Sequence, residues 1–80
     1  MEHDKRLTLR TLIIRDYSVM RDDLLANNGE LFEKFNILER EPNYYDFSEM
    51  SKLLNDLDDY LFERSATSKK VSILSYIDKL

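Results

Sequence analysis

The sequence predicts an all-α fold, a small bundle of about four helices joined by short connections. With one Gly and one Pro in 80 residues, the chain lacks the turn residues that an all-β domain requires. Hydrophobic residues recur at spacings of three and four along most of the chain, which is the period of a helix face. They make up 42% of the residues, and charged residues make up 35%. This is the composition of a folded domain rather than of a disordered chain.

The length indicates one helical domain spanning residues 1–80. A chain this short buries only about 60% of its unfolded surface when it folds. It contains no Cys, which excludes disulfides and thiolate metal sites. Stability must therefore come from packed helices or from self-association.

The first expected helix spans Leu7 to Ala26 and ends near Asn27 or Asn28. Gly29 follows, and both Gly and Asn tolerate the left-handed conformation that ends many helices. The apolar residues of one face are Leu9, Ile13, Tyr17, Met20 and Leu24. Residues 7–14 are also rich in β-forming residues, so a strand is the alternative there.

This first helix is also the reason to expect a homodimer. Ile14 and Leu25 lie on a second face, away from the main apolar face. A helix that is apolar on most sides is usually buried on most sides, and 80 residues offer little to cover it. We therefore expect a second copy to complete the bundle, with the first helix at the interface.

A second helix is expected over Glu30 to Arg40. It must end by Glu41, because Pro42 disfavours the helical conformation of the residue before it. Its apolar face carries Leu31, Phe35 and Leu38.

The third helix has the clearest start signal in the chain. Asp46 and Glu49 have the spacing of a capping box. Tyr45 and Met50 have the spacing of a hydrophobic staple around that cap. The apolar stripe that follows consists of Met50, Leu53, Leu54, Leu57 and Leu61.

Ser65, Ala66 and Thr67 indicate a break after the third helix. A fourth helix is expected over Ser68 to Leu80, with Thr67 as its cap. Its inward residues are expected to be Val71, Leu74 and Ile77.

Charge divides the chain into three parts. Residues 1–21 hold five basic and three acidic side chains, and residues 64–80 hold four basic and one acidic. Residues 22–63 hold three basic and twelve acidic ones. Basic ends and an acidic middle can pair within one chain, each surface pair contributing about 0 to 1 kcal/mol. They can also orient two subunits.

No catalytic, cofactor or metal site is expected from the sequence. The only histidine, His3, has no nucleophile or second ligand near it. The only glycine cannot form a phosphate-binding loop by itself. The acids Asp56, Asp58, Asp59 and Glu63 lie within a helix and lack the spacing of a calcium loop. We interpret them as a solvated face.

The candidate partner-binding residues lie on the third helix. At 100° per residue, Asp56, Asp59 and Glu63 fall opposite the apolar stripe, and Phe62 lies at the edge of that polar side. An aromatic side chain beside carboxylates is typical of a binding surface. The alternative is that Phe62 packs inside the bundle.

These features favour a non-enzymatic protein-binding module, a small cytoplasmic regulator or inhibitor that occupies the surface of another protein. Abundant Asn, Ile, Lys, Tyr and Phe suit the AT-rich genome of a bacteriophage or low-GC bacterium. The alternative is a nucleic-acid-associated regulator that uses Arg10, Arg21, Lys69 and Lys70 on phosphates, or an acidic mimic of nucleic acid. The net charge of −4 argues against direct nucleic-acid binding. No membrane span is expected, because no apolar run approaches about 18 residues.

Overall fold

The computed structural model describes residues 4–80, and the described chain is helical without any strand. Its elements are α1 (Lys5–Tyr17), a 3₁₀ turn η1 (Ser18–Met20), α2 (Arg21–Asn27), α3 (Gly29–Arg40), α4 (Phe47–Ser65) and α5 (Lys70–Asp78). The predicted all-α bundle is confirmed. The alternative of a strand at residues 7–14 is wrong, because these residues belong to α1.

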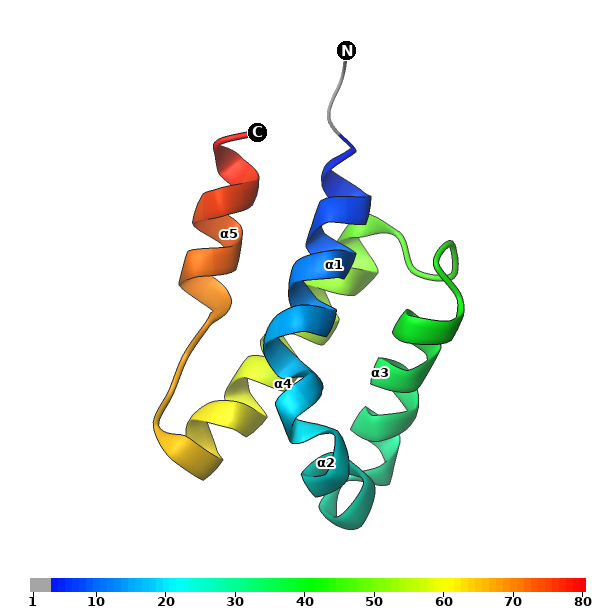
Figure 1. Cartoon of the computed structure of the whole chain (residues 1–80), viewed down its shortest axis with the longest axis vertical. Coiled ribbons are helices and arrows are strands. Elements are labelled where there is room, and N and C mark those ends of the chain that lie inside the picture. The colour runs from blue at the N-terminus through cyan, green and yellow to red at the C-terminus, as the bar shows by residue number, and fades with distance from the viewer. Residues whose placement is uncertain (1–3) are drawn as a thin grey trace.

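Helix α1 is the central element of the bundle (Figure 1), and it contacts α3, α4 and α5. Helices α1 and α4 run in the same direction, and α3 and α5 return the opposite way. The chain therefore covers three sides of α1 by itself. Ile14 packs against the core, and only Leu25 of the second face is largely exposed, at 60%. The homodimer stays a prediction, but it is not needed to cover α1.

The expected continuous first helix is interrupted at Ser18–Met20. Tyr17 (φ −111°, ψ −1°) and Met20 (φ −90°, ψ 0°) depart from ideal helical angles. The tighter turn redirects α2 against α3 (Figure 1). No Gly or Pro marks this position. The break therefore comes from packing, which still buries all five residues of the predicted face.

Asn28 both ends α2 and caps α3. Its side chain accepts a hydrogen bond from the amide of Leu31 at 3.2 Å, as an N-cap residue does. Gly29 is the first residue of α3 and has no positive φ. The helix end near Asn27 was predicted correctly, but the left-handed glycine expected to cause it is absent.

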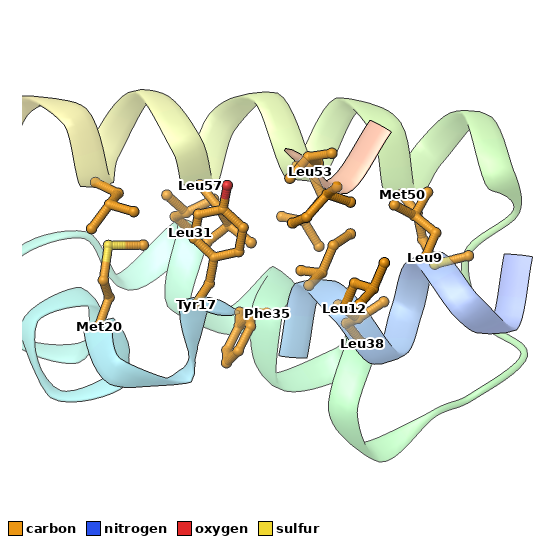
Figure 2. Packing of buried hydrophobic residues seen from close by; sticks show 14 of the residues in the cluster. Leu9, Leu12, Tyr17, Met20, Leu31, Phe35, Leu38, Met50, Leu53 and Leu57 are labelled. Carbon is orange, nitrogen blue, oxygen red and sulfur yellow. The ribbon is translucent and has the colours of Figure 1, made fainter. Parts of the chain in front are cut away.

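The buried hydrophobic residues of the described chain form one cluster (Figure 2). The side chains of Phe35 from α3 and Leu57 from α4 are fully buried in it. The others are Leu9, Leu12, Ile13, Tyr17, Met20, Leu24, Leu31, Leu38, Met50, Leu53, Leu54, Leu61, Ile73 and Ile77. The cluster contains the whole stripe predicted for the third helix.

Two arginines of α1 hold the end of α3 and the connection that follows it. Arg10 donates to the carbonyl oxygens of Leu38 and Glu39, at 2.9 and 2.8 Å. Arg6 donates to the carbonyl oxygen of Pro42 at 2.7 Å. The last carbonyls of a helix have no partner within it and carry partial negative charge. These cations therefore stabilise the turn between α3 and α4.

Helix α4 begins with the capping box that was predicted. The Asp46 carboxylate accepts from the amide of Glu49 at 2.7 Å, and the amide of Asp46 donates to the Glu49 carboxylate at 3.0 Å. Met50 is buried, and Tyr45 packs half-buried against the core. The cap and its flanking hydrophobic residues thus set where α4 starts.

Asp58 is the buried charged residue of the described chain, only 4% exposed. Its carboxylate accepts hydrogen bonds from the hydroxyls of Tyr17 (2.6 Å) and Ser68 (2.7 Å). It also accepts from the backbone amides of Lys69 (2.8 Å) and Lys70 (3.2 Å). The prediction that Asp58 lies on a solvated face is wrong, because its position on α4 faces α1 and the start of α5.

The start of α5 also differs from the prediction. The Thr67 hydroxyl donates to the carbonyl oxygen of Ser65 at 3.3 Å and does not cap a helix. Helix α5 begins at Lys70, and the residue before it supplies no side-chain cap. Asp58 satisfies the first amides of α5 from another helix. A tertiary contact therefore replaces the local cap that the sequence suggested.

The inward face of α5 contains Ile73 and Ile77, with Leu74 half-buried. Ile77 and Leu74 agree with the prediction. Val71 does not, since it is 70% exposed. At 100° per residue, Ile73 lies about 40° around α5 from Ile77, whereas Val71 lies about 120° from it. Ile73 rather than Val71 therefore shares the inward face with Ile77.

Burial raises the pKa of the Asp58 carboxyl, but the hydrogen bonds from Ser68, Tyr17 and the two backbone amides outweigh burial. The net pKa lies below its usual value. Burial also raises the pKa of Tyr17, and the nearby Asp58 carboxylate raises it further. The pair is therefore held as a neutral phenol donating to an ionised carboxylate.

We predict that Ala66→Gly stabilises the protein. Ala66 ends α4 in the left-handed conformation (φ 55°), which costs a residue with a Cβ about 1 kcal/mol. Ala66 is exposed, so glycine removes this strain without loss of packing. We expect urea unfolding to show a gain of about 1 kcal/mol. The control is Ala26→Gly in α2, also exposed, which should lose about 0.5 to 1 kcal/mol. A loss in both variants would contradict this account of Ala66.

We predict that the stabilising effect of Asp58 disappears in acid. A carboxyl whose pKa is lowered by folding stabilises the folded state above its unfolded pKa of about 3.9. That stability is lost as the pH falls through the lower folded pKa. Urea melts of wild type and Asp58→Asn should therefore differ most near neutral pH and converge below about pH 4. Asp59→Asn removes an exposed carboxylate from the same turn as a control. A difference that stays constant down to strong acid would refute the role of the ionised carboxylate.

Candidate functional site

An open groove runs between α3 and α4. It has a volume of about 330 Å³. Its lining residues are Asn28, Glu30, Leu31, Lys34, Asp56, Asp59, Tyr60 and Glu63. Three of the four predicted site residues therefore share this groove, although they were selected from one helix alone.

The groove is acidic. Asp56, Asp59 and Glu63 follow the spacing i, i+3 and i+7, which aligns them along one side of α4. Glu30 adds a fourth carboxylate from α3. The one cation in the lining is Lys34, whose ammonium lies 3.6 Å from the Glu30 carboxylate. The other three carboxylates of the lining form no ion pair with a lysine or arginine of the lining.

Tyr60, a residue of the groove lining, is held by contacts with α2 and with Arg64. Its hydroxyl donates to the Asp23 carboxylate of α2 at 3.0 Å and accepts from Arg64 at 2.8 Å. The Arg64 guanidinium also lies over the Tyr60 ring, 4.7 Å from its centroid, and 3.4 Å from the Asp23 carboxylate. These contacts join α2 to α4, so the groove wall that carries Glu63 is held by two helices.

Phe62 lies outside the groove, on a neighbouring face of α4. It does not line the cavity, and its side chain is 56% exposed. The alternative that Phe62 packs inside the bundle is therefore wrong. The structure brings together Asp56, Asp59 and Glu63 and leaves the fourth predicted residue next to them on the surface.

The α3 side of the groove, formed by Glu30, Leu31 and Lys34, was not predicted from the sequence. Their nearness to α4 depends on how two helices pack, and no local pattern reports that. The burial of Asp58 was not predicted either, although the sequence contains a signal for it. Asp58 continues the three-and-four spacing of Leu54 and Leu61, so its position belongs to the apolar stripe rather than to the polar face.

Within residues 4–80, no group of three or more His, Asp or Glu side chains is arranged to hold a metal ion. His3 lies outside the described residues. The polar groups of the groove are carboxylates, an amide, an ammonium and a phenol. This set favours electrostatic binding of a cationic partner over nucleophilic chemistry.

Four cations were candidates for phosphate binding, and two of them, Arg10 and Arg21, form contacts within the chain. Arg10 holds the end of α3. Arg21 pairs with Glu39 of α3 and lies over the Phe35 ring, 5.5 Å from its centroid. Lys69 and Lys70 are half-buried, and their amides bind Asp58.

No protein-family model matches the chain, and neither a curated protein nor a solved structure matches it significantly. None of the helices in the described part of the chain combines the length and the apolar character needed to cross a membrane.

We predict that Phe62→Ala leaves stability almost unchanged. An exposed side chain contributes little to the core, and surface substitutions usually change stability by less than about 0.5 kcal/mol. The matched control is Phe35→Ala, which removes a fully buried ring and should cost about 3 to 5 kcal/mol. Thermal and urea melts of both variants measure the difference. A large loss of stability in Phe62→Ala would show that this ring packs in the fold and is not free to contact a partner.

Proposed function

We propose that this chain is a non-enzymatic protein-binding module, a small cytoplasmic regulator or inhibitor that acts by occupying the surface of another protein. The observation that carries the proposal is the convergence of Asp56, Asp59 and Glu63 with Glu30 in one open groove. The partner surface is basic, because the groove presents an excess of carboxylates. The proposal assigns the chain no reaction of its own.

Charge of one sign in a recess raises the local potential more than the same charge spread over a convex surface. Such a potential accelerates encounter with an opposite charge and orients it. Since only Lys34 of the lining is cationic, most of this potential is free to act on an incoming lysine or arginine. The groove is therefore suited to receive a basic segment.

Phe62 supplies the apolar contact that carboxylates lack. Affinity in protein interfaces usually depends on a few aromatic or arginine anchors that become buried on binding. Phe62 is exposed and lies one residue from Glu63 and three from Asp59. In the proposal, Phe62 contributes affinity, and the groove contributes orientation and the rate of association.

The acidic groove also suits the alternative of a nucleic-acid mimic, because a nucleic-acid-binding protein is one kind of basic partner. Direct binding to nucleic acid has less support than mimicry of nucleic acid. Arg10 and Arg21 are committed to contacts with α3, and phosphate contacts need exposed cations. Displacement of the captured partner by duplex DNA would identify the mimic.

The test is capture of partners from a lysate of the source cells by the immobilised protein. We expect Asp59→Lys combined with Glu63→Lys to abolish capture, because it reverses the charge of the groove. Capture by wild type should weaken as salt rises, since screening shortens the range of exposed charges to about 10 Å at 0.1 M.

The matched control is Asp22→Lys combined with Glu41→Lys. Both acids are exposed and lie outside the groove, so the net charge changes equally while the groove is unaltered. We expect this control to capture the partner normally. Equal loss in both double variants would mean that net charge, and not the groove, governs binding. Equal capture by both would exclude the groove as the binding site. Melts of each variant confirm that it remains folded.

A further inference from the structure

Helix α5 has few apolar anchors in the bundle. Of its nine residues, only Ile73 and Ile77 are buried. Val71 and Tyr76 are 70% and 52% exposed. The helix lies along one side of α1 (Figure 1), so its removal would leave the contacts of α1 with α3 and α4 in place.

An open pocket lies at the surface where α1 and α5 meet. It has a volume of about 240 Å³ and is lined by Leu12, Arg15, Asp16, Ser72, Ile73 and Tyr76. Arg15 donates to Asp16 at 2.8 Å, so this ion pair stays within α1 instead of crossing to α5. Side chains that line an open pocket face solvent over part of their surface, so they make fewer contacts across the interface than closely packed side chains do.

Asp58 adds polar contacts at the start of α5. It accepts from the Ser68 hydroxyl and from the amides of Lys69 and Lys70, all at or just before the start of α5. A helix of nine residues is not stable by itself in water, and α5 has no side-chain cap of its own. Asp58 therefore both attaches α5 and stabilises its first turn.

We propose that α5 is a detachable helix and that Asp58 is its latch: the helix opens as a unit while α1 to α4 stay folded. The Tyr17 hydroxyl bonds the same carboxylate from α1 and remains bound when α5 leaves. Water can then replace the three donors near α5, so the open state does not contain a buried, unpaired charge. Opening uncovers the part of the core beneath Ile73 and Ile77.

The experiment is amide hydrogen exchange of the full chain, followed by NMR in low concentrations of urea. Amides of α5 should exchange faster than the core amides of α4 and with a weaker dependence on urea, because local opening exposes less surface than global unfolding. Asp58→Asn should accelerate exchange in α5 by about tenfold or more, the effect of losing a hydrogen bond to a charged group.

Ser68→Ala is the second variant, since Ser68 is exposed and contacts Asp58 only from the α5 side. It should accelerate exchange in α5 and leave α4 unchanged, even if Asp58→Asn weakens the whole fold. Thr67→Ala is the control, because the Thr67 hydroxyl bonds Ser65 instead of Asp58. It should alter neither helix. Equal exchange rates and equal urea dependence of α4 and α5 in wild type would overturn the latch, as would equal acceleration of both helices by Ser68→Ala.

Discussion

The carboxylate of Asp58 joins α1, α4 and the start of α5 through four hydrogen bonds. Removing a carboxylate from water is costly unless donors replace its hydration, and hydrogen bonds to an ionised group are stronger than neutral ones. The chain after α4 has to bring Ser68 and two amides to this one group. The left-handed turn at Ala66 lies in the chain that makes this approach. The start of α5 is held by this carboxylate, which binds the first amide of the helix and the amide just before it.

A second constraint is the use of arginine in an acidic chain. Arg6 and Arg10 bind backbone carbonyls at the end of α3 and in the loop that follows, and Arg21 pairs with Glu39. These cations are therefore not near the acids of the α3–α4 groove. The lining of the groove holds four carboxylates and one cation, Lys34, so negative charge is in excess there.

Helix α4 connects the core, the groove and the latch. Its apolar stripe packs on α1 and α3 (Figure 2), one polar side lines the groove, and Asp58 faces α1 and α5. The groove and the latch use different sides of this helix, so a partner seated in the groove does not have to displace α5. The capping box at Asp46 sets the start of the helix, and the rotation of about 100° per residue separates the residues of the different sides.

The sequence by itself determined the helical class, the capping box, the apolar stripe of α4 and the alignment of three acids along one side of that helix. Each depends on residues within four positions of one another, where helical geometry decides which side chains are neighbours. Only the tertiary structure decided the break at Ser18–Met20 and the burial of Asp58. It also decided that Glu30 lines the same groove as the acids of α4. The inward face of α5 carries Ile73, and not Val71 as predicted, for the same reason. These features depend on groups far apart in the chain, such as Tyr17 and Asp58, whose meeting is set by how whole helices pack and not by any local preference.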